Sequence, residues 1–406
     1  MFALTLILHS WLSLLMPAAD PATSTSTADN VPGVIIYHHP DSVAKKQYVG
    51  SPGIIALSKT HYLAKLDLFG PNAAKENYYP TYVFESFDAG LTWKQIASLD
   101  HLFWANIFEH NGALYLLGTT GEHQNLVIRR STDIGRTWTE PLDAKTGLIA
   151  QGKYHTAPMP IIEHNGRLWR AFEEASRSAK WGDRYSAMMI SAPIGSDLLD
   201  RDSWLLSDMI VKNPKWLDGK FNAFLEGNVV ITPEGDLVDI LRVDDNLGRT
   251  AAVVHIDDDG KHVTFDPEKD FIEFPGGAKK FTIRFDPQTK SYWTLTNWVP
   301  DFVPNEKPAS KRNTLALAMS KDLKTWEIRS VILHHPDHKT VGFQYVDWLF
   351  EDNDLIVASR TAFKDESGNA HNQHDANYLT FHRIPNFRDL TMKDSCADFL
   401  KAAAKP

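Results

Sequence analysis

The 406-residue sequence lacks several features that would indicate other classes of protein. Cys396 is its only cysteine, so no disulfide can form within the chain, and a thiol nucleophile this close to the C-terminus is not expected. With 42 basic and 51 acidic residues, the net charge of −9 argues against a nucleic-acid partner. No long window shows the periodicity of an amphipathic helix. These absences leave a nearly all-β protein as the expected class.

A long apolar run is also missing, apart from residues 2–16, which are too few to span a bilayer comfortably. Small residues and a Ser/Thr-rich polar stretch follow this run. The order of segments resembles a secretory signal peptide, predicted at residues 1–19, and a polar linker at residues 20–32. We therefore expect a secreted or periplasmic protein without a membrane span.

A short motif, S-x-D-x-G-x-T-W, occurs at residues 86–93 and again at residues 131–138. A shorter copy that has lost the glycine covers residues 320–326. The Asp carboxylate can accept hydrogen bonds from the backbone of a turn, and glycine can take a positive φ. The tryptophan can anchor the turn between neighbouring sheets. Two intact copies indicate a structural repeat.

Hairpin signals recur along the chain and divide it into units. Turns such as Asn111-Gly112 and Asn165-Gly166 precede apolar runs, as expected where antiparallel strands meet. Six units are predicted, near residues 51–100, 101–146, 155–210, 225–272, 279–334 and 343–385. Units of this length with three or four strands are typical of β-propeller blades.

We therefore predict an all-β fold in which residues 33–390 form a single β-propeller with six blades, or seven if a degenerate blade is present. Residues 391–406 form a C-terminal tail. The last unit lacks one strand, and a strand predicted at Val34–Tyr37 could complete it and close the ring. A pair of β-sandwiches is the alternative, but five similar hairpins at regular spacings favour the ring.

Polar residues stand where the apolar strands begin or end, and in a propeller these ends gather around the axis. Arg242 interrupts an apolar strand, and a buried arginine needs an anionic partner, either Asp244 or Glu226 or the carboxylate of a ligand. His155 opens the inner strand of the third unit and could exchange protons near neutral pH. The other candidate site residues are Asp67, Glu173, Lys280, Asn297, Tyr345 and Arg360.

The repeated motif resembles the Asp boxes, or BNR repeats, of sialidase-like β-propellers. Sialidases hold the carboxylate of sialic acid with three arginines, one of them in an Arg-Ile-Pro element near the mature N-terminus, and use a tyrosine nucleophile. Here residues 1–128 contain no arginine, and the only Arg-Ile-Pro stands at residues 383–385. The missing arginines argue against an authentic sialidase, but they do not change the predicted fold, because one fold can carry different activities.

Four further stretches resemble the propeller enzymes that act on rhamnose–glucuronate linkages, namely ulvan lyases, rhamnosyl-glucuronate lyases and related rhamnohydrolases. They are YVGSP with LFGP (residues 48–52 and 68–71), YHTAP with GRLWR (154–158 and 166–170), EGN with LR (226–228 and 241–242), and DANYLTFHR (375–383). The sequence has Leu66-Asp67 where these relatives carry His-Asp. This protein would therefore use another base or be inactive on their substrate.

This resemblance implies cleavage of a uronate-containing glycan, in the first instance by β-elimination. That reaction needs a cation to neutralise the carboxylate, a base for the C5 proton and an acid for the leaving oxygen. We assign these roles to Arg242, His155 and Tyr345, respectively. The predicted sugar-binding residues are Asp67, Glu173, Glu226, Lys280, Asn297 and Arg360.

Two alternatives remain open, glycoside hydrolysis by a rhamnosidase-like or exo-sialidase-like enzyme, and a non-catalytic glycan-binding propeller. We expect an acidic oligo- or polysaccharide as the partner in each case. No cofactor is expected, although a calcium or zinc ion is left open because His371 and His374 stand three residues apart in a polar loop.

Overall fold

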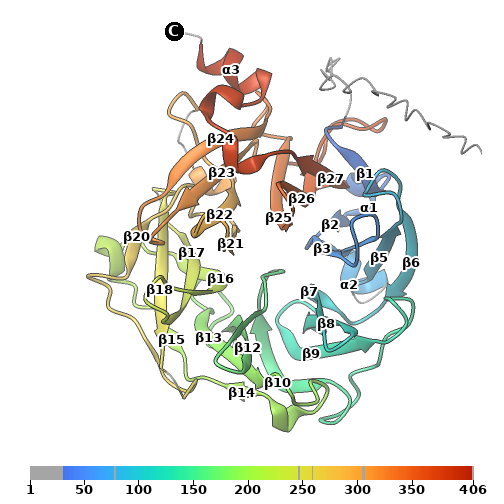
Figure 1. Cartoon of the computed structure of the whole chain (residues 1–406), viewed down its shortest axis with the longest axis vertical. Coiled ribbons are helices and arrows are strands. Elements are labelled where there is room, and N and C mark those ends of the chain that lie inside the picture. Colours follow the sequence, from blue (N-terminus) through green and yellow to red (C-terminus); the bar gives the residue numbers. More distant parts are fainter. Residues whose placement is uncertain (1–30, 77–78, 246, 258, 304–306, 405–406) are drawn as a thin grey trace, which may run out of the picture. The chain divides into compact units, whose positions relative to one another are not determined.

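Strands make up most of the computed structural model, which describes residues 31–76, 79–245, 247–257, 259–303 and 307–404. The predicted signal peptide, and all but the last two residues of the predicted linker, lie outside these ranges. Within the unit Pro32–Pro406, the described strands form five antiparallel sheets that follow one another in chain order around a common centre (Figure 1). No helix among the described residues is long and apolar enough to cross a membrane.

Chain order assigns most strands to their sheets. The first sheet contains β2 (Tyr48–Val49), β3 (Gly53–Ala56), β4 (Tyr62–Phe69), β5 (Thr81–Ser86) and β6 (Lys94–Leu99). The second contains β7 (Phe103–His110), β8 (Ala113–Thr119), β9 (Gln124–Ser131), β10 (Leu148–His155), β11 (Ile162–His164), β12 (Arg167–Glu174), β13 (Ser186–Pro193), β14 (Leu205–Leu206) and β15 (Ile210–Val211).

The remaining sheets have four or five strands each. The third contains β16 (Ala223–Ile231), β17 (Leu237–Asp244), β18 (Thr250–Ile256), β19 (Val263–Thr264) and β20 (Phe271–Glu273). The fourth contains β21 (Thr282–Asp286), β22 (Ser291–Thr296), β23 (Thr314–Ser320) and β24 (Glu327–His334). The fifth contains β25 (Gly342–Glu351), β26 (Asp354–Ala362), β27 (Tyr378–Ile384) and the N-terminal strand β1 (Val34–His38).

Helices are short and lie in the connections. The α-helices are α1 (Ser42–Lys45), α2 (Ala73–Glu76) and α3 (Ala397–Ala403). The 3-10 helices are η1 (Arg201–Ser203), η2 (Trp216–Gly219), η3 (Pro308–Ser310), η4 (Phe387–Asp389) and η5 (Met392–Asp394). The predicted tail is packed against the fold, because Phe399 of α3 is buried against Val331 of β24 and the Cys396 N–H bonds to the Val331 carbonyl.

The second sheet joins two of the predicted units. The first half of β10 pairs with β9, placing Leu148 opposite Val127, whereas its last residues pair with β12, placing His155 opposite Glu173. The strand thus begins at the outer edge of one unit and ends as the inner strand of the next. Six blades result only if this nine-stranded sheet is divided in two, so the blade count stays a prediction.

The repeated S-x-D-x-G-x-T-W turns have the expected geometry. Asp133 accepts hydrogen bonds from the backbone N–H and the hydroxyl of Thr137 at 2.9 and 2.6 Å, and Gly135 has a φ of 80°. The indole of Trp138 donates to the Gly135 carbonyl at 2.9 Å. The copy at residues 86–93 repeats these contacts, and its Trp93 ring lies 5.8 Å from the ring of Phe381 in the fifth sheet. The tryptophans therefore link a turn to a neighbouring sheet, as predicted.

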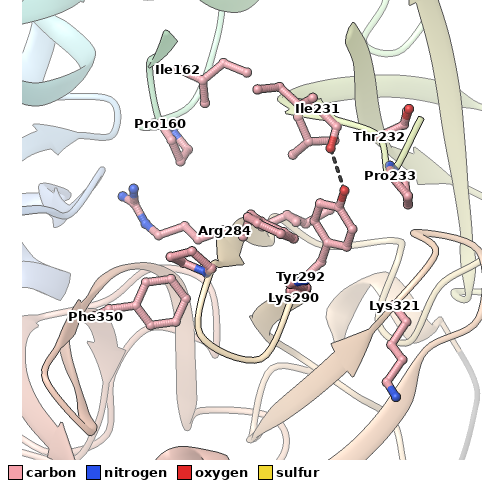
Figure 2. Close-up of a pocket in the computed structure, with 14 residues that line it drawn as sticks. Pro160, Ile162, Ile231, Thr232, Pro233, Arg284, Lys290, Tyr292, Lys321 and Phe350 are labelled. Carbon is pink, nitrogen blue, oxygen red and sulfur yellow. Dashed lines mark hydrogen bonds between the residues drawn. The ribbon is translucent and has the colours of Figure 1, made fainter. Parts of the chain in front are cut away.

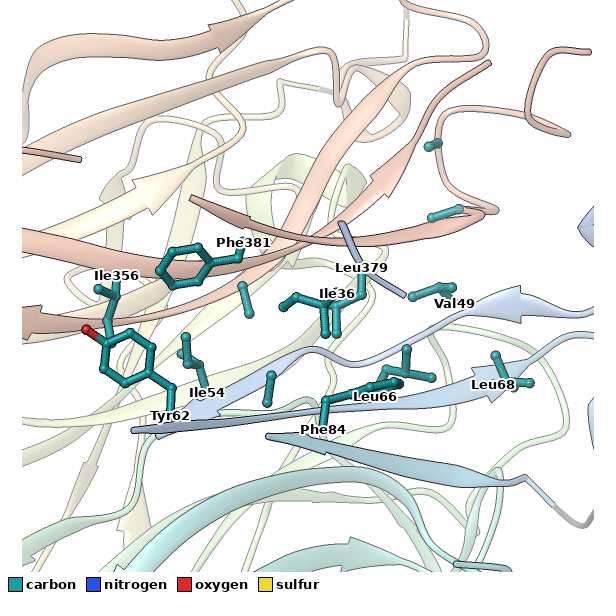
Figure 3. Packing of buried hydrophobic residues seen from close by; sticks show 14 of the residues in the cluster. Ile36, Val49, Ile54, Tyr62, Leu66, Leu68, Phe84, Ile356, Leu379 and Phe381 are labelled. Carbon is teal, nitrogen blue, oxygen red and sulfur yellow. The ribbon is translucent and has the colours of Figure 1, made fainter. Parts of the chain in front are cut away.

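Buried apolar side chains fill the space between adjacent sheets. Figure 3 shows the cluster where the first and fifth sheets meet, with Leu66 and Phe84 on one side and Leu379 and Phe381 on the other. The N-terminal strand belongs to this cluster through Ile36, since β1 pairs antiparallel with β27. Strand β3 of the first sheet also contacts β25 of the fifth. The earliest described strand thus stabilises the last sheet, as the predicted completion of that unit requires.

Replacing Ile36 tests this pairing. Ile36 is 7% exposed within the cluster, so Ile36→Ala should lower the free energy of unfolding by about 2–5 kcal/mol, measured by urea unfolding. Ile35, the preceding residue of β1, is 46% exposed, and Ile35→Ala is the matched control with a much smaller effect. Equal effects of the two changes would show that β1 does not pack as described.

Candidate active site

A polar cavity of about 210 Å³ collects side chains from the first, second, third and fifth sheets and from the β22–β23 connection of the fourth. Seven of the nine predicted site residues belong to it or to its immediate support. Its lining comprises Gly50, Ser51, Asp67, Phe69, Phe103, Trp104, Glu122, His155, Trp181, Tyr185, Leu225, Glu226, Arg242, Arg312, Tyr345, Arg360 and His374. The cavity is therefore the place where residues distant in sequence can act on one ligand.

Three inner strands carry the same distortion at this cavity. The registers of β7, β16 and β25 each shift by a bulge, between Phe103 and Asn106, Leu225 and Asn228, and Gln344 and Asp347. Inside these bulges, Trp104, Glu226 and Tyr345 have φ values of 51°, 59° and 53°, in the left-handed region that non-glycine residues rarely adopt. A bulge re-aims a side chain that regular pleating would send elsewhere. The distortion thus delivers one side chain from each of three sheets to the cavity.

The bulge in β16 depends on a neighbouring glycine. A Cβ at Gly227 would lie 2.1 Å from the Asp239 Oδ1 atom, so any other residue beside Glu226 would force the buried Asp239 side chain to move. Asp239 is fully buried, and neither of its carboxylate oxygens has a hydrogen-bond partner among the described residues. Burial raises the pKa of Asp239 well above its usual value. The carboxyl group is therefore held neutral below the bulge.

Tyr345, Glu226 and Arg242 form a hydrogen-bonded chain in the cavity. The Tyr345 hydroxyl donates to Glu226 Oε1 at 2.8 Å, and Arg242 Nη1 donates to Glu226 Oε2 at 2.8 Å and lies 3.4 Å from the Tyr345 hydroxyl. Burial acts to raise the pKa of Glu226, but the charge of Arg242 together with the hydrogen bonds from Arg242 and Tyr345 and the other nearby groups outweighs it, and the pKa is lowered. Burial and the charge of Glu226 raise the pKa of Tyr345. A neutral tyrosine thus points its proton at an ionised carboxylate.

Two further guanidinium groups flank Tyr345 and have unused donors. Arg312 and Arg360 are 5% and 4% exposed, and their planes lie 5.6 and 4.7 Å from the Tyr345 ring centroid. Arg360 donates to the His374 carbonyl at 2.6 Å, but its Nε, and the Nε and Nη1 of Arg312, have no hydrogen-bond partner within the described part of the chain. Neither arginine takes part in an ion pair among the described residues. Buried cations with free N–H groups form a site for an anion.

His155 and Glu173 share a proton at the edge of the cavity. His155 Nδ1 lies 2.6 Å from Glu173 Oε2. Burial lowers the pKa of His155 to about 4, and burial with the charge of Glu226 raises the pKa of Glu173 well above its usual value. At neutral pH the pair is therefore an uncharged imidazole and a protonated carboxyl group. Glu173 is not in the lining, so its contact with the cavity runs through His155.

Asp67 lines the cavity and also fixes its shape. Its Oδ1 accepts the Ser51 N–H and its Oδ2 accepts the Trp104 N–H, both at 2.7 Å. Lys65 Nζ lies 3.9 Å from the same carboxylate. The Leu66-Asp67 element thus ties the first sheet to the bulge of β7, which gives Asp67 a positioning role whatever it does with a ligand.

Two predicted sugar-binding residues, Lys280 and Asn297, do not line the cavity. Lys280 is buried and donates to the Val346 carbonyl at 2.7 Å. The Asn297 amide donates to the carbonyls of Arg312, Thr314 and Phe343 at 3.2, 3.0 and 2.7 Å. Both residues lie at the ends of apolar strands, where the Lys280 ammonium group and the Asn297 amide donate hydrogen bonds to backbone carbonyls. Asn297 thereby positions Arg312.

Arg312 is one of the lining residues that the sequence analysis did not predict; others are Glu122, Trp181 and Tyr185. Arg312 lies in the segment Lys311-Arg312-Asn313, which reads as an ordinary solvated loop before β23. The connection from β22 to β23 joins the second and third strands of the fourth sheet, and it carries Arg312 to the cavity. His374 and His371, considered for a metal, instead contact the two oxygens of Asp375 at 2.8 and 2.6 Å.

A larger cavity, of about 800 Å³, lies toward the opposite ends of the inner strands (Figure 2). It is lined by Ile231 at the end of β16 and Phe350 near the end of β25, whereas Glu226 and Tyr345 stand near the starts of these strands. The ionisable groups in its lining are Arg284, Lys290, Lys321 and Tyr292. Without a carboxylate or histidine it offers no base near neutral pH. The smaller cavity is therefore the candidate active site.

The sequence matches no protein-family model and no curated protein. Three solved structures share the fold over 87% of this chain. A microbial sialidase described as Hadza Hz136 has a TM-score of 0.56 at 15% identity and is covered over 68% of its length. A protein of unknown function from Dyadobacter fermentans has 0.55 at 14% identity and is covered over 100%. The GH93 α-L-arabinofuranosidase of Fusarium graminearum, in complex with arabinobiose, has 0.54 at 12% identity and is covered over 97%.

The chain shares its fold with these three proteins, two of which are a sialidase and an arabinofuranosidase. At these identities the comparisons establish only the fold, so the function must be inferred from the residues of the cavity. The resemblance to the rhamnose–glucuronate lyases finds no counterpart in the reported structures.

The unpaired state of Arg312 has a measurable consequence for stability. Arg312 is buried beside Arg242 and Arg360, and its Nε and Nη1 have no partner among the described residues, so its charge is not compensated; burial and this repulsion lower its pKa to about 10. Arg312→Met should therefore raise the free energy of unfolding, by about 0.5–2 kcal/mol in urea unfolding. Arg170→Met is the matched control. Arg170 is equally buried but bonds to Asn106, Ala157 and Ala171, so its removal should destabilise. A loss of stability in Arg312→Met would contradict this interpretation.

Proposed function

We propose that the protein is a glycoside hydrolase that releases an acidic sugar with retention of anomeric configuration. The observation that carries this proposal is the Tyr345 hydroxyl, bonded to the ionised Glu226 and surrounded by Arg242, Arg312 and Arg360. The proposal takes up the hydrolase alternative from the sequence analysis. It includes export directed by residues 1–19, a secreted or periplasmic location, and an acidic glycan as the partner.

The three arginines would hold the carboxylate of the sugar. Arg242 already bonds to Glu226, whereas Arg312 and Arg360 have guanidinium donors without a partner among the described residues. A planar guanidinium binds a carboxylate through two parallel hydrogen bonds, and the interaction gains strength where water is excluded. A carboxylate placed here would neutralise the excess positive charge around Tyr345.

Tyr345 would act as the nucleophile and Glu226 as its base. The Tyr345 oxygen forms a bond to the anomeric carbon while the bond to the leaving oxygen breaks, and the phenol proton passes to Glu226 Oε1. Water then attacks the same carbon from the vacated side and gives a proton to the group that protonated the leaving oxygen, while the bond to Tyr345 breaks and Tyr345 recovers its proton from Glu226. A neutral nucleophile suits a substrate that carries a carboxylate beside the reacting carbon, because an anionic nucleophile would be repelled.

The leaving oxygen needs a proton, and two other carboxyl groups line the cavity. Both oxygens of Asp67 already accept backbone N–H groups, which holds that carboxylate in place as an acceptor. The side chain of Glu122 is 55% exposed at the cavity. Glu122 is the better placed of the two to exchange protons with solvent and donate to the leaving group.

The geometry favours hydrolysis over the β-elimination predicted first. Elimination assigns the base to His155, but an imidazole with a pKa of about 4 is a weak base, and its Nδ1 is engaged by Glu173. Elimination also assigns the acid to Tyr345, whose proton is directed at Glu226. The role of Arg242 as the carboxylate neutraliser is common to both reactions.

We also propose that the inner strands form a closed ring of six blades. The nine-stranded sheet divides at β10, and the pairing of β1 with β27 and the contact of β3 with β25 support closure. A closed ring would explain why residues from four sheets and from the β22–β23 connection reach one cavity.

Product analysis and Tyr345→Phe test the reaction. The protein should release methylumbelliferone from its glycoside of N-acetylneuraminic or glucuronic acid, and should form no ultraviolet-absorbing unsaturated sugar from a glucuronate polysaccharide. Tyr345→Phe should lower kcat by at least about 10²-fold, because the nucleophile is lost. Tyr292→Phe is the control, since Tyr292 is also buried and loses one hydrogen bond, to the Ile231 carbonyl. An unsaturated product, or binding without turnover, would refute the proposal.

Arg312→Met tests the recognition of the carboxylate. Its kcat/KM should fall by about 10–100-fold on the acidic glycoside, because a buried charge-assisted hydrogen bond is worth about 1.5–3 kcal/mol. The matched substrate is the same glycoside with its carboxylate converted to the amide, on which the variant and the original protein should differ little. A similar loss on both substrates would show that Arg312 does not contact the carboxylate.

A further inference from the structure

Trp181 is the exposed aromatic side chain of the cavity lining. It is 49% exposed, whereas Phe103 and Tyr185 in the same lining are each 3% exposed. Leaving a large apolar ring in water forgoes the free energy that burial would provide. An exposed indole at the mouth of a polar cavity is therefore a candidate surface for a ligand.

The loop that carries Trp181, between β12 and β13, is anchored rather than free. Asp183 pairs with Lys180 at 2.9 Å and with Lys212 at 2.5 Å, and Arg184 Nη1 contacts His123 Nδ1 at 3.0 Å. Gly182 has a φ of 83°, and a Cβ there would lie 2.8 Å from the Asn222 carbonyl oxygen. The ring is thus held in place before any ligand binds, which reduces the entropy lost on binding.

Trp181 ends a row of aromatic rings that begins inside the cavity. The Trp104 and His155 rings are 4.4 Å apart, the His155 and Tyr185 rings 4.6 Å, and the Tyr185 and Trp181 rings 6.2 Å. His155, Glu226 and Arg242 line the same cavity. The row therefore leads from the reacting groups outward to the exposed indole.

The size of the cavity determines how much of a glycan it can enclose. Its volume of about 210 Å³ is below the roughly 300–1,000 Å³ of pockets that enclose drug-sized ligands. A cavity of this volume can enclose one sugar residue. The next residue of the glycan must then lie at the mouth, beside Trp181.

We propose that Trp181 is a stacking platform for the neutral sugar residue joined to the acidic one, on the leaving side of the cleaved bond. This inference rests on the proposed function. The apolar face of a pyranose, with its C–H groups, packs on the indole, while the arginines hold the acidic sugar. Trp181 thereby selects glycans in which the acidic residue is attached to another sugar rather than to a small alcohol.

A comparison of two substrates tests the platform. We use sialyl-lactose and the methyl glycoside of N-acetylneuraminic acid, and, as a second pair, a glucuronosyl disaccharide and methyl glucuronide. Trp181→Ala should reduce the kcat/KM of the longer substrate about tenfold more than that of the methyl glycoside, which corresponds to about 1.4 kcal/mol. Trp181→Phe should recover part of the difference. Phe87→Ala, which removes a 64% exposed ring outside the cavity, is the control.

The outcomes separate this inference from the proposed function. Equal losses on the long and short substrates would overturn the platform and leave hydrolysis intact. If no glycoside in either pair is cleaved, the proposed function fails, and calorimetric binding of the same pairs decides the platform. A longer ligand that binds Trp181→Ala and the original protein equally well, or that binds the original protein no more tightly than its methyl glycoside, would overturn it.

Discussion

The candidate active site depends on a backbone conformation that the chain adopts at a cost. Trp104, Glu226 and Tyr345 are all in the left-handed region, each within a bulge of an inner strand. Such conformations cost on the order of 1–3 kcal/mol each and persist only where the surroundings enforce them. Here the surroundings are specific. Asp67 accepts the Trp104 N–H, and Gly227 makes room for the turn beside Glu226. Side chains of a regular strand alternate between its two faces. The three bulges instead direct Trp104, Glu226 and Tyr345 into one cavity.

The second constraint is charge. A protein with a net charge of −9 concentrates three guanidinium groups around one tyrosine, with Glu226 as the one carboxylate paired to them. The neighbouring pair of His155 and Glu173 carries no charge, because burial keeps Glu173 protonated and His155 uncharged. Desolvation therefore removes the charges of His155 and Glu173, which lie near the arginines. The arginines remain charged and lack enough anionic partners.

The sequence predicted the parts of the structure that depend on local chemistry. The turns at residues 86–93 and 131–138, the hairpins, the strand at Val34–Tyr37 and the interruption of β17 by Arg242 all follow from residue type and spacing. What failed was the inference from strand ends to the cavity for Lys280 and Asn297, because a polar residue at a strand end can equally satisfy backbone carbonyls. Arg312 was missed because its segment has the composition of a solvated loop. Burial, which distinguishes it, arises only from tertiary packing. The left-handed φ of Tyr345 has no sequence signal, since neither it nor Val346 is a glycine.

In the sequence, the absence of arginine from residues 1–128 argues against a sialidase-type site. The structure weakens that inference, which assumes that the arginine nearest the first sheet must come from the first part of the chain. Arg360 belongs to β26, yet its guanidinium lies 4.3 Å from the centroid of Phe69 in the first sheet and 4.7 Å from that of Tyr345. Because the first and fifth sheets pack together, a side chain from the end of the sequence can occupy space beside its beginning. A set of three arginines around a nucleophile is a constraint on positions in space, and the order in which the chain supplies them is not part of the chemistry.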